Sequence, residues 1–198
     1  LVKRQMEIEN FVKEKFFKVA LDCGDFEVTS DSIKDEAEAK ELQKLTEGED
    51  AECSSIKEEM KKENPPKLFD LTSLQREANK LIGLTAQQTL DCVQSMYEKK
   101  LVTYPRTDSQ YLTDDMQESV RNIISLLAEN RDDFNLDEKN FGKIYDNRKV
   151  SDHHAIIPTM ESFKTDISTL SSNEKVVLDL ISTRLLCAVS PCYEFKNT

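Results

Sequence analysis

The sequence predicts an α+β fold, with a mainly helical, winged-helix-like domain attached to a small β-rich arm. Patterns typical of helix N-termini, each followed by apolar residues at three- and four-residue steps, recur between residues 67 and 186. Short extended segments separated by turn residues lie before this region, and another closes the chain at residues 193–198. Pro65-Pro66 marks the boundary, because proline interrupts regular secondary structure.

The arm is expected to contain a hairpin and a helix. Residues 16–23 and 26–29 flank Gly24-Asp25, which predicts two strands joined by a tight turn. Ser32 is the expected cap of a helix that runs to about Leu45.

Two capping patterns predict adjacent helices at the start of the helical domain. Thr72 with Gln75 matches a capping box and opens a helix that ends at Gly83, and Thr85 with Gln88 repeats the pattern. The second helix is expected to carry its apolar residues on one face. Two helices joined by a short glycine-containing turn, with an extended segment after them, are the layout of a winged-helix-like unit. An ordinary helical hairpin in a core has the same pattern.

Three more helices are expected after this pair. Thr113 is the expected cap of the first, and residues 130–150 are expected to be irregular or to contain a short helix around residues 137–141. Ser172 or Asn173 caps the last, which Pro191 brings to an end.

Residues 104–109 read Tyr-Pro-Arg-Thr-Asp-Ser and bring together groups suited to phosphate chemistry. The Arg106 guanidinium can hold two phosphate oxygens while the Tyr104 phenol oxygen attacks the phosphorus. Pro105 disfavours helical geometry for the residue before it, so Tyr104 is expected at a strand end or in a loop. A tyrosine near an arginine is also a common structural feature, and an unperturbed tyrosine is a poor nucleophile at neutral pH.

The two histidines of the chain, His153 and His154, are adjacent and begin the run His-His-Ala-Ile-Ile-Pro-Thr at residues 153–159. An imidazole can donate a hydrogen bond to a phosphate oxygen, and a carboxylate such as Asp108 can fix its tautomer. The alternative is a surface loop with two solvated histidines. A zinc site is disfavoured, because no cysteine pair lies at ligand spacing from the histidines.

Together these runs resemble the motifs of type IA DNA topoisomerases. Residues 104–109 are similar to the active-site tyrosine motif of that family, and residues 153–159 to its downstream histidine motif. Residues 65–78 (Pro-Pro-Lys-Leu-Phe-Asp-Leu-Thr-Ser-Leu-Gln-Arg-Glu-Ala) are similar to the entry into the tyrosine-bearing domain. The paired histidines and this third run indicate the topoisomerase III branch.

The resemblance implies that Tyr104 attacks a DNA backbone phosphorus and forms a 5′-phosphotyrosine intermediate, which the released 3′ hydroxyl later reverses. Arg106 is implied to hold the scissile phosphate, and His153 to donate to it. Asp108 would orient His153. The residues implied to touch DNA or to support the loop are Thr107, Asp108, Ser109, Ser73, Gln75 and His154.

The resemblance also implies how the domains connect. The final strand would rejoin the N-terminal arm, so residues 1–66 plus 187–198 would form a β-rich hinge arm into which a helical domain of residues 67–186 is inserted. Residues 51–60 alternate weakly and are also compatible with a helix, but the resemblance favours a strand. The arm would move the tyrosine domain and open a gate for strand passage.

The Mg-binding acidic module of the family, with its Asp-x-Asp motif, is not found in the sequence, and the chain starts without methionine. We therefore expect an internal fragment that is inactive alone. Its expected partners are single-stranded DNA and the missing domains of the same chain. Mg is expected in the intact enzyme, whereas no cofactor and no metal site are expected in the fragment.

The net charge of −11 argues at first sight against nucleic-acid binding. Residues 1–66 carry 11 basic and 18 acidic groups, whereas residues 67–125, around the tyrosine motif, carry 7 and 8. We therefore expect weak, salt-sensitive DNA binding by this segment. Five scattered cysteines without a C-x-x-C pair indicate reduced thiols, and no apolar run could span a membrane, so a cytoplasmic location without a membrane partner is expected.

Two other functions compete with catalysis. A non-catalytic winged-helix DNA-binding module would use Tyr104 only as a phosphate contact. It should carry basic residues on its second helix, and residues 86–98 contain none. A protein-interaction scaffold would suit the acidic arm, but it leaves the clustering of Tyr104, Arg106 and His153 unexplained.

Overall fold

The computed structural model describes residues 1–49, 52–129 and 131–198. They divide into two compact units, Leu1–Lys57 and Glu58–Thr198. Helices and short antiparallel strand pairs occur in both units, which confirms the α+β class.

The first unit contains the predicted hairpin and helix. It is built from α1 (Val2–Glu9), β1 (Ala20–Asp22), β2 (Glu27–Thr29) and α2 (Glu36–Thr46). Strands β1 and β2 pair antiparallel, with Leu21 opposite Val28. The turn between them requires a left-handed backbone, which Gly24 adopts at φ +86°. The hairpin is confirmed, with strands shorter than the sequence suggested.

The cap of α2 is Asp35, so the prediction of Ser32 as its cap is wrong. A carboxylate oxygen of Asp35 accepts a hydrogen bond from the Ala37 amide at 2.7 Å. Ser32 lies in an extended segment instead, because the next residue, Ile33, forms an antiparallel bridge with Phe17.

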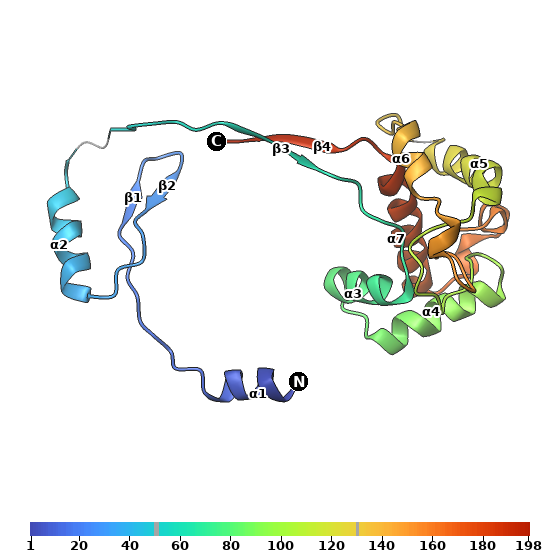
Figure 1. The fold of residues 1–198 in the computed structure, drawn as a ribbon, viewed down its shortest axis with the longest axis horizontal. Helices are drawn as coiled ribbons and strands as arrows, with labels where there is room; N and C mark the ends of the chain where they lie inside the picture. The colour runs from blue at the N-terminus through green and yellow to red at the C-terminus, as the bar shows by residue number, and fades with distance from the viewer. Residues whose placement is uncertain (50–51, 130) are drawn as a thin grey trace. The chain divides into compact units, whose positions relative to one another are not determined.

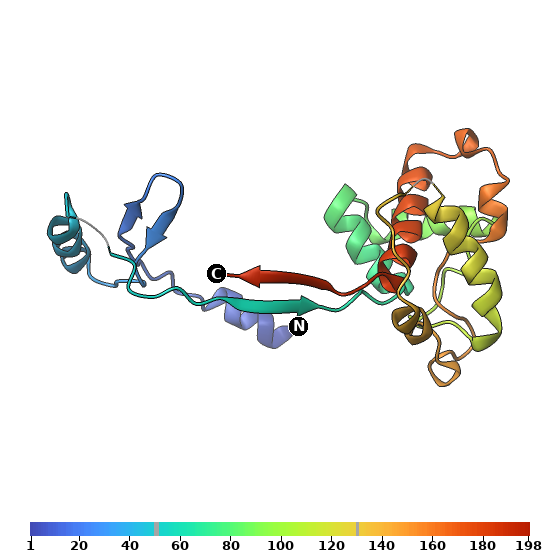
Figure 2. The ribbon, with the colours of Figure 1, turned by 90° about the horizontal axis from the view of Figure 1, so that it is seen from above.

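The second unit begins and ends with a strand pair, β3 (Glu59–Glu63) and β4 (Tyr193–Asn197). The two strands pair antiparallel with Lys61 opposite Phe195, and Figure 2 shows the pair extending away from the helices of this unit. The terminal strand therefore pairs with a segment N-terminal to the helices. Strand β3 begins near the end of the predicted segment 51–60, of which residue 51 lies outside the described residues.

The helical part of the second unit is organised around its longest helix, α7 (Ser172–Val189). Figure 1 shows α7 beside the other α-helices of this unit, and it packs against α3, α4, α5 and α6. Two buried apolar clusters meet along it, one containing Ile181 and the other Leu185. The other helical elements are α3 (Leu71–Ile82), α4 (Ala86–Glu98), η1 (Asp114–Met116), α5 (Gln117–Ala128), α6 (Glu138–Lys143), η2 (Asn147–Lys149), η3 (Met160–Phe163) and η4 (Ile167–Thr169).

Helix α3 starts earlier than the sequence suggested, so the predicted Thr72–Gln75 capping box is wrong. The Asp70 carboxylate accepts from the Ser73 amide at 2.6 Å, and the Ser73 hydroxyl accepts from the Asp70 amide at 3.1 Å. This reciprocal pair satisfies two amides at the helix start. Helix α3 ends at Gly83, as predicted, in a left-handed conformation.

The remaining predicted caps have mixed outcomes. Thr85 and Gln88 form the predicted capping box of α4. Ser171, with Glu174, caps α7 in place of Ser172 or Asn173. Ser172 and Asn173 lie inside the first turn of α7, where a residue cannot serve as the N-terminal cap.

Thr113 precedes the short 3₁₀ turn η1 and makes no side-chain capping bond, so its predicted role as the cap of α5 is also wrong. Helix α5 buries Val120, Ile123 and Ile124. The short helix expected near residues 137–141 is confirmed as α6, whose cap is Asp137.

Candidate active site

The tyrosine and histidine motifs lie side by side although they are far apart in the sequence. Val102 and Pro158 form an antiparallel bridge, and the Thr103 amide donates to the Ile157 carbonyl at 3.0 Å. The Thr103 hydroxyl donates to the Ala155 carbonyl and accepts from the Ile157 amide, both at 3.0 Å. These bonds fix the backbone on which Tyr104 and the histidines are carried.

The third sequence run joins the same assembly from its other end. Phe69 and Ile156 form an antiparallel bridge, with the Ile156 amide donating to the Phe69 carbonyl at 2.8 Å. The Leu71 amide donates to the Thr107 carbonyl at 3.1 Å. All three runs that the sequence singled out therefore meet in one place.

The Tyr104 ring is in contact with two other rings. Its centroid is 4.1 Å from that of His153, with the ring planes tilted by 36°. The Tyr97 ring of α4 meets it edge-on at 5.3 Å. Tyr104 is half-buried, outside any helix as predicted, and its hydroxyl has no hydrogen-bond partner in residues 1–49, 52–129 and 131–198. The hydroxyl is therefore available to a ligand.

Arg106 is exposed and is held by α4. Its Nη1 donates to Oε1 of Gln94 at 2.8 Å. Within the described part of the chain it has no carboxylate partner, so its positive charge is not neutralised by an ion pair. The other guanidinium N–H groups can bind an anion in the bidentate manner typical of arginine.

Gln94 and Tyr97 are site residues that sequence reasoning missed. They lie three positions apart, so they share one face of α4, directed at Arg106 and Tyr104. The sequence predicts that the apolar residues of α4 lie on one buried face, and Val93 and Met96 are fully buried, but Tyr97 is 39% exposed. The one signal in the sequence that could have indicated the site is a polar residue, Gln94, one turn before an aromatic residue, Tyr97.

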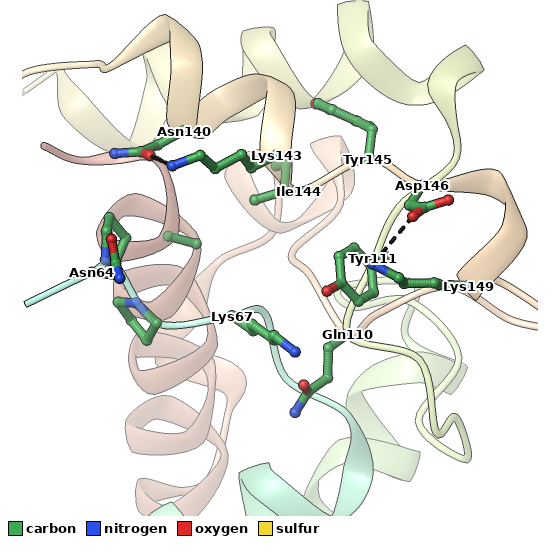
Figure 3. A pocket seen from close by; sticks show the side chains of 13 residues that line it. Asn64, Lys67, Gln110, Tyr111, Asn140, Lys143, Ile144, Tyr145, Asp146 and Lys149 are labelled. Atoms are coloured by element: carbon green, nitrogen blue, oxygen red, sulfur yellow. Dashed lines mark hydrogen bonds and ion pairs between the residues drawn. The ribbon is translucent and has the colours of Figure 1, made fainter. Parts of the chain in front are cut away.

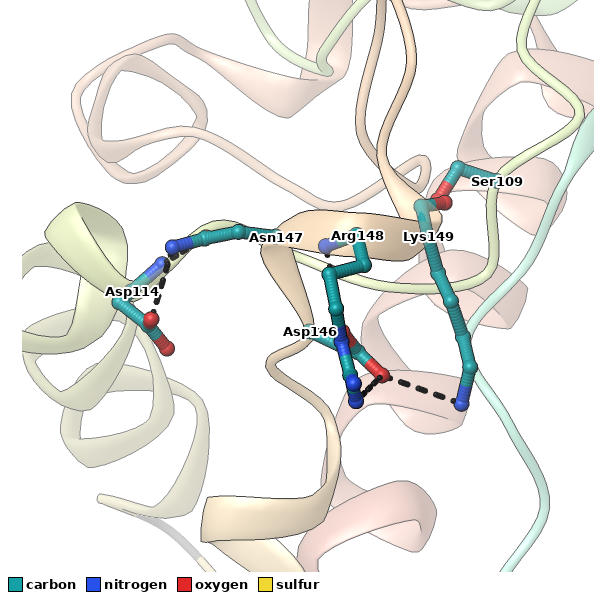
Figure 4. Close-up of polar contacts among 6 residues, drawn as sticks. All are labelled: Ser109, Asp114, Asp146, Asn147, Arg148 and Lys149. Carbon is teal, nitrogen blue, oxygen red and sulfur yellow. Dashed lines mark hydrogen bonds and ion pairs between the residues drawn. The ribbon is translucent and has the colours of Figure 1, made fainter.

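Thr107 and Ser109 brace the loop after Tyr104, and both are buried. The Thr107 hydroxyl donates to the His153 carbonyl at 2.9 Å and accepts from the Ser109 amide at 3.1 Å. The Ser109 hydroxyl donates to the Lys149 carbonyl at 2.8 Å, and Figure 4 shows the two residues adjoining. These hydroxyls satisfy backbone groups of the loop and of its neighbours.

The other predicted site residues form no hydrogen bond with Tyr104 or Arg106 in the part of the chain that the structure describes. Asp108 is exposed and forms no hydrogen bond with His153 or His154 in the described residues. His154 Nδ1 lies 2.9 Å from its neighbour's carbonyl oxygen, that of Ala155. Ser73 is engaged in the cap of α3, and Gln75 Nε2 donates to the Ala86 carbonyl at 3.0 Å, which links α3 to α4.

Helix α4 is anchored to α7 by a mostly buried carboxylate. Glu174 is 7% exposed and accepts from the Ser95 hydroxyl at 2.8 Å and the Lys99 ammonium at 2.7 Å. Burial raises the pKa of Glu174, but the Lys99 charge and the hydrogen bonds from Ser171 and Ser95 outweigh it and hold that pKa at about 2. This contact fixes the helix that carries Gln94 and Tyr97.

The described residues contain no group of three or more histidine, cysteine, aspartate or glutamate side chains that could hold a metal ion. None of the helices in residues 1–49, 52–129 and 131–198 combines the length and apolar composition needed to cross a membrane.

Comparison with known proteins agrees with the sequence motifs. The family model described as DNA topoisomerase matches residues 1–198. The chain is 35% identical over 203 residues to DNA topoisomerase 3 of Staphylococcus saprophyticus, covering 98% of this chain and 28% of that protein. It is 37% identical over 164 residues to DNA topoisomerase 3 of Bacillus subtilis, covering 79% and 22%.

A solved structure has a similar fold. Full-length topoisomerase I from Thermotoga maritima, in a monoclinic crystal form, superposes with a TM-score of 0.67 at 24% identity. The match covers 98% of this chain and 32% of that one. The chain thus spans between about a fifth and a third of the length of these relatives.

Proposed function

Because the chain belongs to the type IA DNA topoisomerase family, in its topoisomerase III branch, we propose that the complete enzyme cleaves and rejoins one DNA strand through Tyr104. The observation that supports this most is the contact between Tyr104 and His153, whose ring centroids lie 4.1 Å apart. Arg106, two positions after Tyr104, has no carboxylate partner among the described residues. Such a set of groups can attack, hold and protonate a phosphodiester.

The proposed reaction exchanges one ester for another. The Tyr104 oxygen bonds to the phosphorus, the bond from phosphorus to the 3′ oxygen breaks, and the phenol proton is transferred so that a 3′ hydroxyl is released. The tyrosine then carries the 5′ end of the cut strand. Attack by the 3′ hydroxyl on the phosphotyrosine reverses both bond changes, so no external energy source is needed.

Arg106 would leave Gln94, or share its donors with it, to hold the scissile phosphate. Charge develops on the phosphate oxygens as the phosphorus becomes five-coordinate, and a guanidinium fork directed at them stabilises that state. His153, whose ring is in contact with that of Tyr104, would donate an N–H to the same phosphate. Asp108 and His154 would act on this histidine or on the adjoining phosphate.

The other residues would support the strand. Thr107 and Ser109 hold the loop through their backbone bonds, while Ser73 and Gln75 would contact single-stranded DNA at the start of α3. We further propose that α3 and α4, with the strand-like bridge after them, act as a winged-helix-like unit. Residues 67–186 would move as this unit on an arm of residues 1–66 and 187–198, in the cytoplasm.

Mg is proposed to act in the complete enzyme through ligands outside the described residues, which offer no suitable donor cluster. The 198-residue chain alone is therefore expected to leave DNA uncut.

Relaxation of supercoiled plasmid tests the proposal. In the complete enzyme, Tyr104→Phe should abolish relaxation, while Tyr193→Phe, a matched exposed tyrosine on β4, should retain it. Relaxation by the Tyr104→Phe enzyme would contradict the proposal. If neither the unaltered enzyme nor the two variants relaxed the plasmid while all of them still bound DNA, a non-catalytic binding module would be favoured.

A further inference from the structure

Two adjoining cavities lie in the second unit and do not include the residues around Tyr104. One has a volume of about 430 Å³ and the other about 450 Å³, and both are lined by Lys67 and Gln110. Neither is lined by Tyr104, Arg106 or His153. The residues that line these two cavities are together called the furrow.

The furrow is basic in an acidic protein. Its lining includes two carboxylates, Glu77 and Asp146, against six cationic side chains. Its charge is therefore +4, whereas residues 67–198 as a whole, with 16 basic and 20 acidic groups, carry −4. The six cationic residues are Lys67, Arg76, Lys80, Lys143, Lys149 and Arg184. Such a local excess of positive charge is the electrostatic footprint of a polyanion site.

One end of the furrow is centred on Tyr111. The ammonium of Lys149 lies 4.3 Å from its ring centroid and that of Lys67 lies 5.5 Å away, and Figure 3 shows both side chains beside the ring. Burial raises the pKa of Tyr111, but the two ammonium groups outweigh it, so the pKa of Tyr111 lies below its ordinary value. The local potential is therefore positive at this ring.

The other end is formed by one face of α3. Ser73, Arg76 and Lys80 follow one another at steps of three and four residues, so they lie along a single face. Glu77 is engaged by Arg184 at 3.6 Å. Arg76, Lys80 and Lys67 have no carboxylate partner in the described residues, which leaves three cationic groups available to a ligand.

We propose that this furrow binds the phosphodiester backbone of DNA, at phosphates other than the one held at Tyr104. A set of six cations that line two adjoining cavities suits a ligand with regularly repeated negative charges better than a single small anion. The proposal rests on the proposed function only in its choice of DNA as the polyanion. It does not depend on any reaction of Tyr104.

Hydrogen bonds connect the residues of the furrow to the two motifs of the candidate active site. The Ser109 hydroxyl donates to the Lys149 carbonyl at 2.8 Å, and the Ala155 amide donates to the Tyr111 carbonyl at 2.9 Å. Tyr111 lies seven positions after Tyr104, which limits the distance between their Cα atoms to about 25 Å. A strand of modest length can therefore reach both places.

Salt-dependent binding of a single-stranded oligothymidylate to the 198-residue chain, measured by fluorescence anisotropy, tests the proposal. A triple variant, Lys67→Gln/Arg76→Gln/Lys149→Gln, should reduce the slope of log K against log salt by about 2, since each lost phosphate contact on a single strand contributes about 0.7. The matched control, Lys164→Gln/Lys175→Gln/Lys196→Gln, makes the same change in net charge outside the furrow and should leave the slope unchanged.

Equal effects of the two triple variants, or no salt-dependent binding by the unaltered chain, would overturn the proposal. In the second case an acidic peptide would become the better candidate ligand. If the furrow triple variant does not fold, Arg76→Gln alone, at an exposed position, should still lower the slope by about 0.7. The anisotropy measurement involves no cleavage, so failure of the proposed catalysis and failure of the furrow are distinguishable.

Discussion

The hydroxyl of Thr103 joins two segments of the candidate site by donating to the Ala155 carbonyl and accepting from the Ile157 amide, both at 3.0 Å. One side chain thereby satisfies two backbone groups of the histidine motif while its own backbone leads directly into Tyr104. The geometry of the site depends on this contact, because Ala155 and Ile157 are buried where water cannot replace the hydroxyl.

Thr103→Val should therefore destabilise the chain. Valine keeps the shape but leaves a buried amide and carbonyl without this partner, which costs about 1–3 kcal/mol. Urea unfolding followed by circular dichroism measures the change. Thr165→Val, which removes an exposed hydroxyl bonded to the Glu161 carbonyl, should change stability by no more than about 0.5 kcal/mol. Equal losses would show that the Thr103 bridge has no special role.

The cap of α3 gives a second prediction. Asp70→Ala removes the carboxylate that accepts from the Ser73 amide, and it should lower the free energy of unfolding by about 0.5–2 kcal/mol. Thr72→Ala should have little effect, because Thr72 is exposed and lies within the first turn. The reverse order of effects in urea unfolding would restore the cap that the sequence suggested.

Glu174 predicts a dependence of stability on acid pH. Its pKa is about 2 in the folded chain and near 4.5 when unfolded, so its stabilisation is complete above pH 4.5 and is lost as the pH falls towards 2. Glu174→Gln should lower stability at pH 7 by about 1.5–3 kcal/mol, the range for hydrogen bonds to a charged group. The difference between the two proteins should shrink at pH 3. A constant difference would mean that the carboxylate charge is not responsible.

Gln94 predicts a change in DNA cleavage by the complete enzyme. Gln94→Ala removes the acceptor that holds Arg106, so we expect cleavage to slow by up to about tenfold, equivalent to about 1.4 kcal/mol. Arg106→Ala should slow it by about 10²–10³, as for loss of a group that stabilises transition-state charge.

Gln87→Ala is the control for Gln94, because that side chain bonds to Asp91 on the same helix instead. Single-turnover cleavage of an oligonucleotide compares the three variants. A Gln94 variant that cleaves at the unaltered rate would exclude a positioning role.

Local patterns in the sequence predicted much of the fold. Gly24, Gly83 and the Thr85–Gln88 box are signals within a few residues, and each has the expected structure. The errors at Ser32 and Thr72 arose because several polar residues near a helix start can serve as the cap. Which one does so is decided by where the chain enters from neighbouring elements, as the Phe17–Ile33 bridge shows for α2.

The candidate site was predictable only as far as its motifs. Tyr104, Arg106 and His153 stand in runs that can be recognised by themselves, but Gln94 and Tyr97 reach the site through the packing of α4 on α7. The basic furrow was not predictable either. Its cations come from separate elements, α3, α6, η2, α7 and the segment between β3 and α3, and no window of the sequence shows them together.

Covalent trapping tests the central claim most directly. The complete enzyme with Mg, incubated with an oligonucleotide labelled at its 3′ end and then denatured, should carry the label, whereas a 5′ label should remain on free DNA. Protease digestion and mass spectrometry should then find the nucleotide on the peptide that contains Tyr104. A nucleotide on any other residue, or a protein that retains the 5′ label, would contradict the account.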